Sequence, residues 1–250
     1  MQWVEKINRA IEDGRFRLFG QMIRPIQQPT GPVYKEILLR LIDQDGDMVL
    51  PSQFIPAAER FRMMPAIDKW VLDAALTEIG RLGDSETDAT DAFTINLSGQ
   101  SLVDPDLMEL IVRGLDRNGI SPSRVLFEIT ETAAISNLSV ARDFIRELRD
   151  RGCRFILDDF GSGLSSFRYL KSLDVDFLKI DGELVRNIAQ DPIQREMVAA
   201  IHRIGASMGI RTIGEWVESA DVERELREIG VDYAQGFSIA RPAPFGIDSS

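Results

Sequence analysis

The sequence has little cysteine and little histidine, and it has no long apolar run. Cys153 is its one cysteine and His202 its one histidine. An intramolecular disulfide is therefore impossible, which excludes a secreted scaffold held together by disulfides, and a site built on several histidines is excluded too. No stretch approaches the ~20 apolar residues that cross a bilayer, and residues 1–13 are amphipathic, unlike a signal peptide. We expect a cytoplasmic protein, or the cytoplasmic domain of a membrane-attached one, with no direct membrane contact from this segment.

Positive charge is also scarce. The chain has 29 lysines and arginines against 40 aspartates and glutamates, for a net charge of −11. An acidic surface does not attract a polyphosphate backbone, so we expect no long nucleic acid as a partner. A small ligand that carries phosphate remains compatible with this charge if metal ions supply the positive charge.

Short apolar runs and helical patterns alternate along the chain. The runs predict eight strands, at 16–23, 33–42, 93–97, 125–129, 155–158, 177–180, 211–214 and 233–237. Patterns of helical period predict helices at 56–82, 105–114, 138–151, 192–208 and 220–229. This alternation is typical of βαβ units and a parallel sheet. Eight units in 250 residues give ~31 residues per unit, so we expect a single TIM-like (β/α)8 barrel domain over residues 1–250.

The connection between the first two strands departs from this pattern. Only residues 24–32 separate the two strands, whereas a parallel crossover needs a dozen residues or more. We therefore expect the first strand to run antiparallel to its neighbour.

Every predicted strand from the second to the eighth carries a polar side chain within or at the end of its apolar run. These side chains are Glu36, Asn96, Glu128, Asp158 and Asp159, Lys179, Glu215 and Gln235. Burying so many charges separately would cost several kcal/mol each unless they are paired or bind metal. The carboxyl ends of barrel strands converge on one mouth, where the active sites of this fold lie. We therefore expect these groups to meet in one site.

The composition of this cluster indicates a hard divalent cation. Carboxylates with an amide suit Mg²⁺ or Mn²⁺ better than Zn²⁺. The adjacent Asp158 and Asp159 could serve two ions ~3.5–4 Å apart, the separation used in phosphodiester hydrolysis. Lys179 could orient or deprotonate a water molecule, because a lysine near other cations has a lowered pKa. A barrel that holds one metal and uses Lys179 as the base of an enolase-type reaction remains an alternative.

These residues, in this order, resemble the EAL-domain phosphodiesterases, which hydrolyse the bacterial second messenger cyclic di-GMP. The E-x-L-x-R signature stands here as E-I-L-L-R at 36–40. The most specific blocks are L-D-D-F-G-S-G-L-S-S at 157–166 and L-K-I-D-G at 178–182, with N-L-S at 96–98 and F-E-I-T-E at 127–131. The resemblance covers nearly the whole chain and implies a TIM-like barrel with an antiparallel first strand.

The resemblance also implies a role for each site residue. Glu36, Asn96, Glu128 and Asp158 would bind a first metal ion, and Asp158 and Asp159, supported by Glu215, would hold a second. Glu36, Lys179 and Glu215 would serve catalysis, with Lys179 in contact with the catalytic water. Gln21, Leu38, Arg40, Asp181 and Gln235 would bind the substrate or shape the site around it. Glu131 would anchor the loop at 160–170, which in this family links the metal site to the dimer interface.

The activity implied by the resemblance is hydrolysis of cyclic di-GMP to linear pGpG with two Mg²⁺ or Mn²⁺ ions per site. The alternative is a cyclic di-GMP receptor with weak or no turnover. Two departures from the family pattern bear on this choice: Ile37 replaces a small residue, and Trp216 stands beside Glu215 where the family has a small one. We expect Ile37 to point away from Glu36, whereas Trp216 keeps the receptor alternative open. The resemblance further implies a homodimer and a place within a longer multidomain signalling protein.

Overall fold

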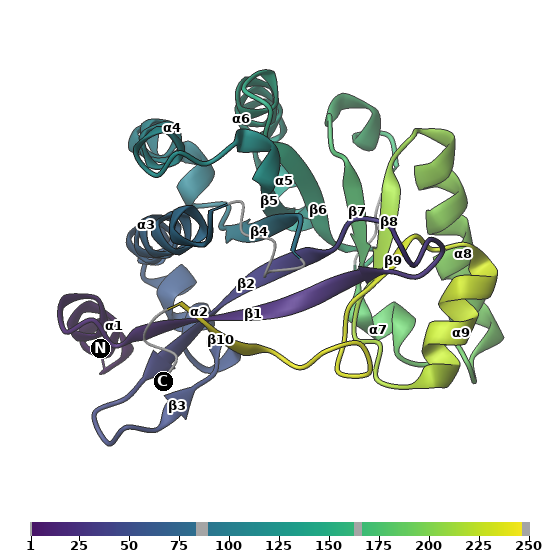
Figure 1. Ribbon diagram of the computed structural model, residues 1–250, viewed down its shortest axis with the longest axis horizontal. Coiled ribbons are helices and arrows are strands. Elements are labelled where there is room, and N and C mark those ends of the chain that lie inside the picture. Colours follow the sequence, from purple (N-terminus) through teal and green to yellow (C-terminus); the bar gives the residue numbers. More distant parts are fainter. Residues whose placement is uncertain (1, 84–89, 163–166, 247–250) are drawn as a thin grey trace.

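The computed structural model describes residues 2–83, 90–162 and 167–246, and eight of its strands close into a barrel (Figure 1). The barrel strands are β1 (Phe16–Pro25), β2 (Tyr34–Ile42), β4 (Ala92–Leu97), β5 (Val125–Thr130), β6 (Arg154–Phe160), β7 (Phe177–Ile180), β8 (Arg211–Gly214) and β9 (Tyr233–Ala234). The barrel closes because β1 pairs with β2 on one side and with β9 on the other. The predicted TIM-like barrel is confirmed.

The first strand runs antiparallel to both of its barrel neighbours, as predicted. The remaining barrel strands pair parallel to one another, from β2 round to β9. The connection between β1 and β2, residues 26–33, is too short to hold a crossover helix. The antiparallel register places Gln21 opposite Glu36, so β1 also contributes a polar side chain near the carboxyl ends of the other strands.

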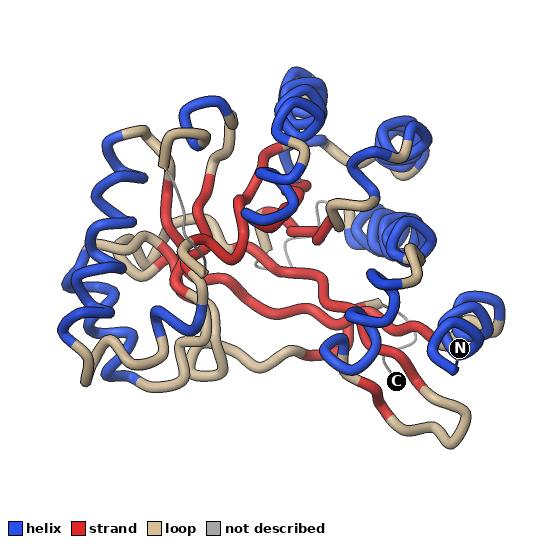
Figure 2. Tube along the Cα trace, turned by 180° about the vertical axis from the view of Figure 1, so that it is seen from behind, coloured by secondary structure: helices blue, strands red, loops and turns tan. Residues whose placement is uncertain are grey.

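Helices surround the barrel on the outside (Figure 2). They are α1 (Gln2–Glu12), α2 (Pro51–Arg60), α3 (Met64–Leu82), α4 (Pro105–Arg117), α5 (Glu131–Ser136), α6 (Leu138–Asp150), α7 (Gly182–Val185), α8 (Pro192–Ser207) and α9 (Ala220–Ile229), with short 3₁₀ turns at Ser101–Val103, Pro122–Arg124 and Leu170–Ser172. Within the described ranges, no helix has both the length and the apolar character that a membrane span requires.

The prediction of one helix over 56–82 was wrong. The chain forms α2 and α3 instead, separated by a turn at 61–63. Arg62 has a φ of +56°, which a helix interior does not tolerate, and Pro65 lies in the first turn of α3. Proline is favoured there because the first helical residues need no N–H donor. The apolar period continues across the turn, so it did not reveal the break.

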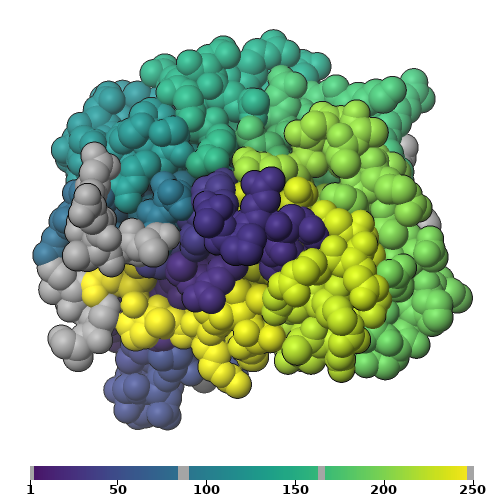
Figure 3. Space-filling view, turned by 45° about the vertical axis from the view of Figure 1, so that its right-hand side comes forward, coloured from purple at the N-terminus to yellow at the C-terminus, as the bar shows by residue number. Residues whose placement is uncertain are grey.

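Two short strands extend the sheet beyond the barrel, and neither was predicted. β3 (Met48–Val49) pairs with β2 as a hairpin, and β10 (Ala243–Phe245) pairs antiparallel with β1. Runs of two or three residues are too short to show a strand period. The pairing of β10 with β1 brings the late part of the chain, yellow in Figure 3, against the early part, purple in the same view.

The barrel interior contains a layer of apolar side chains to which each of the eight strands contributes one. The layer consists of Ile23, Tyr34, Ala92, Leu126, Ile156, Phe177, Ile213 and Tyr233, and we call it the apolar plug. Phe177 packs edge to face with both Tyr34 and Tyr233, at centroid distances of 5.4 and 5.7 Å. A separate, larger core lies between the barrel and the helices. The plug fills the barrel at this level. Positions called above the plug lie nearer the carboxyl ends of the parallel strands.

Candidate active site

A ring of polar side chains lies directly above the apolar plug. Side chains two residues apart on a strand point to the same face, so the position two residues nearer the mouth also faces the interior. On the eight strands or directly after them, these positions are Gln21, Glu36, Thr94, Glu128, Asp158, Lys179, Glu215 and Gln235. The strand pleat and the barrel closure therefore bring eight distant parts of the sequence into one site.

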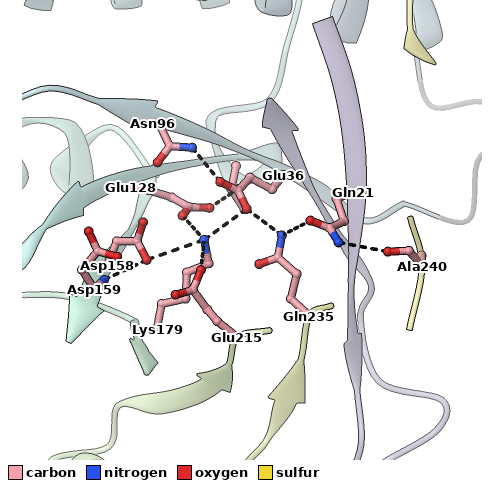
Figure 4. Close-up of polar contacts among 11 residues, drawn as sticks. Gln21, Glu36, Asn96, Glu128, Asp158, Asp159, Lys179, Glu215, Gln235 and Ala240 are labelled. Carbon is pink, nitrogen blue, oxygen red and sulfur yellow. Dashed lines mark hydrogen bonds and ion pairs between the residues drawn. The ribbon is translucent and has the colours of Figure 1, made fainter. Parts of the chain in front are cut away.

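Lys179 lies at the centre of this ring and is 1% exposed (Figure 4). Its Nζ is 2.8 Å from Glu128, 3.1 Å from both Glu36 and Glu215, and 3.6 Å from Asp158. Burial disfavours the charged ammonium, but these surrounding carboxylates raise the pKa of Lys179 well above its usual value. This direction is opposite to the lowered pKa that the sequence predicts for a lysine beside cations, because carboxylates are the charges that surround Lys179 here.

Glu36 is the most hydrogen-bonded carboxylate of the ring. Asn96 donates to its Oε1 at 2.7 Å, and Gln235 donates to its Oε2 at 2.6 Å. Burial alone would raise the pKa of Glu36, yet Lys179 and the hydrogen bonds from Gln235 and Asn96 hold it below its usual value. Gln235 also donates to Gln21 at 3.3 Å. The ionised form of Glu36 is thus the one that this site stabilises.

The other carboxylates of the ring are less well compensated. Burial raises the pKa of Glu128 to about 8, with the charge of Glu36 adding to the effect, although the Thr94 hydroxyl donates to Glu128. Burial raises the pKa of Asp158 to about 6 and that of Glu215 well above its usual value. One ammonium faces four carboxylates, so the ring has negative charge that Lys179 does not neutralise.

A second acidic group lies at the edge of the ring. Oxygen atoms of Asp158, Asp159 and Glu215 all lie within 4.8 Å of one another. Adjacent side chains on a regular strand point to opposite faces, but Asp159 has a φ of +53°, and the pairing of β6 with β7 is irregular between Leu157 and Phe160. This local departure from strand geometry lets two consecutive aspartates face the same place.

The donor set fits a hard divalent cation. The side chains that converge are carboxylates and amides, which are oxygen ligands of the kind that Mg²⁺ and Mn²⁺ take. A bound divalent cation would stabilise the ionised form of the carboxylates whose pKa values are raised. Gln235 adds a buried Oε1 atom that has no hydrogen-bond partner among the described residues, so this atom remains available as an acceptor in the site.

The ring opens into a cleft of about 490 Å³. Glu36, Asp158, Lys179 and Glu215 line it together with Gln21, Leu38, Arg40, Leu50, Trp216, Phe237 and Pro242, among others. The Arg40 guanidinium donates to the carbonyl of Leu39 at 2.7 Å and lies 5.4 Å from the ring of Phe19. The cleft therefore combines an acidic floor with partly apolar walls.

Glu131 and Asp181 are predicted site residues that lie beside the ring rather than in it. Glu131 begins α5 and is buried. It accepts hydrogen bonds from the Gly161 backbone at 3.2 Å and from the Tyr169 hydroxyl. It thus contacts both sides of the expected loop, of which residues 163–166 lie outside the described residues. Asp181 directly follows β7 and caps α7 by accepting from the backbone of Glu183 at 2.8 Å.

Asp68, a buried carboxylate on α3, was not predicted from the sequence. Asp68 accepts hydrogen bonds from the Ser98 backbone at 2.9 Å and from the Ser101 hydroxyl at 2.6 Å. These bonds hold the turn that follows Asn96. The helical period could have identified it, because Asp68 falls on the buried face of α3, next to Ile67 and one turn before Leu72. A charged residue on the apolar face of a helix requires a partner.

Known proteins share both the sequence pattern and the fold. The family model described as the EAL domain matches residues 4–242. The chain is 40% identical over 243 residues to the cyclic di-GMP phosphodiesterase PdeB of Shewanella oneidensis, covering 97% of this chain and 28% of that protein. It is 31% identical to the cyclic di-GMP phosphodiesterase PdeF of Escherichia coli, covering 96% of this chain and 32% of that protein. The chain thus spans about a third or less of the length of these two relatives.

Solved structures agree with this assignment. The phosphodiesterase PaMucR in complex with c-di-GMP superposes with a TM-score of 0.89 at 28% identity, covering 99% of both chains. The FimX EAL domain from Pseudomonas aeruginosa bound to c-di-GMP superposes with a TM-score of 0.88 at 28% identity, covering 97% of this chain and 96% of that one. On the family match over residues 4–242, this chain belongs to the EAL domain family.

Proposed function

We propose that this chain hydrolyses one phosphodiester bond of cyclic di-GMP and releases linear pGpG, with two Mg²⁺ or Mn²⁺ ions in its site. The observation that carries the proposal is the polar ring itself, in which four carboxylates surround one buried lysine, and Glu36, Asp158, Lys179 and Glu215 line the cleft above the apolar plug. The names of the relatives PdeB and PdeF support the same substrate and the same reaction.

The residues present fit two adjacent cations. Glu36, Asn96, Glu128 and Asp158 would hold one, and Asp158, Asp159 and Glu215 would hold the other. Bound divalent cations would lower the pKa of a water molecule and neutralise the phosphoryl oxygens. The position of Asp158 supports this division, because its carboxylate lies 3.6 Å from Lys179 Nζ, the atom that Glu36 and Glu128 also contact, and within 4.8 Å of oxygens of Asp159 and Glu215.

The chain's own residues would position the reacting groups. Lys179 carries its proton at Nζ within reach of Glu36 and Glu128, so it would orient the attacking water and stabilise charge on it. The guanidinium of Arg40 at the edge of the cleft would bind the substrate phosphates. Gln21, Leu38, Asp181 and Gln235 would complete the substrate site.

The wider setting of the domain also belongs to this proposal. The relatives PdeB and PdeF are about three times longer than this chain, which supports a role for residues 1–250 as one domain of a longer signalling protein. The homodimer and the cytoplasmic location stay predictions.

The test is direct incubation of the purified chain with cyclic di-GMP and Mg²⁺ or Mn²⁺, with chromatography to separate pGpG. We expect pGpG with either cation and none in EDTA. Glu128→Gln should abolish the product because it removes a charged ligand. Tight binding of cyclic di-GMP by calorimetry without product would contradict hydrolysis and assign the domain to the receptors.

A further inference from the structure

Trp216 is an exposed aromatic side chain at the mouth of the cleft. It follows Glu215 directly and lines the same cleft as Lys179. Trp216 is 48% exposed, whereas Trp3 and Trp70 are partly buried against the main core. A large apolar ring that stays exposed in a cleft with an acidic floor gains little from the core, so its position points to a ligand.

The backbone at Trp216 is held in an unfavourable conformation. Its φ is +49°, in the left-handed region that bulky residues rarely adopt. Hydrogen bonds on both sides enforce this turn, from Glu215 N to the carbonyl of Ile180 at 3.3 Å and from Val217 N to the carbonyl of Gln235 at 3.0 Å. Residues held in such conformations cluster at ligand-binding sites, where the surrounding structure compensates for the strain.

The indole ring also packs closely against a glycine of α7. A Cβ atom placed on Gly182 would lie 2.2 Å from Cδ2 of Trp216, so the indole packs directly on the Gly182 backbone. Only glycine leaves room for the ring there. Gly182, the first residue of α7, therefore covers part of the indole, while Trp216 remains 48% exposed. The ring is positioned before any ligand arrives, which lowers the entropic cost of binding against it.

The chemistry of a suitable ligand follows from this position. It must bring a flat, extended π system to the indole while its phosphodiester reaches the carboxylates next to Trp216. A purine base attached through its ribose to the phosphodiester has this form, and bases stack readily on aromatic side chains. We propose that Trp216 stacks on one guanine base of cyclic di-GMP and so sets the affinity of this domain for its substrate. This inference rests on the proposed function.

Stacking of a guanine base on Trp216 predicts a particular kinetic change when the ring is removed. Loss of one stacked base should weaken ground-state and transition-state binding alike. Trp216→Gly should therefore raise KM about tenfold, within the range measured for stacked bases, and leave kcat within about twofold. Trp216→Phe keeps a ring and should raise KM less than about threefold.

The glycine variant also separates binding from folding. Glycine adopts a positive φ without strain, so Trp216→Gly should keep or raise Tm while KM increases. Trp70→Phe, which changes an indole away from the cleft, is the matched control and should leave KM unchanged.

The experiment measures steady-state hydrolysis of cyclic di-GMP and Tm for these proteins. A raised KM with unchanged kcat in Trp216→Gly, and near-normal KM in Trp216→Phe, is the expected result. A KM within twofold of the wild type, or a fall in kcat alone, would overturn the stacking role while leaving the proposed hydrolysis intact. Absence of turnover by the wild type would overturn the proposed function and this inference with it.

Discussion

Lys179 and Glu36 are 143 residues apart in the sequence, yet the Lys179 Nζ atom lies 3.1 Å from Oε2 of Glu36 inside the barrel. Both side chains stand two residues above the apolar plug, on β7 and β2, and both are buried. A buried ammonium needs carboxylate partners, and the carboxylates in turn need a cation. The site is therefore an electrostatic unit in which removal of one charge affects all the others.

Lys179→Met tests this dependence. The substitution leaves the buried carboxylates without their internal cation, so the free energy of unfolding in EDTA should fall by about 3 kcal/mol or more. Urea denaturation followed by circular dichroism measures this change. The matched control is Lys69→Met, because Lys69 pairs with Asp104 at 2.8 Å on the surface. The control should lose less than about 1 kcal/mol, and equal losses in the two variants would contradict the account.

Metal binding should depend on pH. Burial raises the pKa of Glu128 to about 8 and that of Asp158 to about 6, so protons compete with the cation at these ligands. As the pH rises from 6 to 8 these groups lose their protons, so the affinity for Mn²⁺ should increase and binding should release fewer protons. Calorimetry in two buffers of different ionisation enthalpy measures this release. Binding at pH 6 that releases no protons would contradict the raised pKa values.

Asp68→Ala should damage the site from a distance. It removes the acceptor for the Ser98 backbone and the Ser101 hydroxyl, which leaves a buried donor unpaired. We expect a loss of about 1–3 kcal/mol in the free energy of unfolding and weaker Mn²⁺ binding, because the turn after Asn96 is loosened. Asp73→Ala on the same helix is the control, since Asp73 pairs with Arg117 at the surface. Equal effects of the two substitutions would argue against the role of Asp68.

Cys153 should be unreactive in the folded protein. Its side chain is 3% exposed, and burial raises the pKa of the thiol to about 11. At pH 8 roughly one thiol in a thousand is then ionised, and the thiolate is the reactive form. Labelling with a chromogenic disulfide reagent should be slow in buffer and rapid in denaturant. Rapid labelling of the folded protein would show that the start of β6 is open.

The strand period explains why so much of the site could be predicted. A polar residue inside an apolar run stands out, and alternation states which of its neighbours share its face. The same rule predicts that Ile37 points away from Glu36, and the structure confirms this, because Ile37 is 2% exposed in the core outside the ring. Thr94 was not predicted, because threonine is common in strands and does not stand out as a buried polar residue.

Other features depend on contacts that no local pattern contains. The positive φ of Asp159 arises where β6 and β7 fall out of register, and that of Trp216 arises where β8 passes into the turn against Gln235. The raised pKa of Lys179 follows from carboxylates on four other strands. The tertiary structure creates these properties, so the sequence alone could identify the residues but not their backbone conformations or the directions of their pKa shifts.

The most direct test of the account is a crystal structure of the protein with Mn²⁺, with the metal located from its anomalous scattering. We expect two peaks at the mouth of the barrel, one within reach of Glu36 and Glu128 and one within reach of Asp159 and Glu215, with Asp158 between them. A single peak, or manganese bound only outside the polar ring, would contradict it.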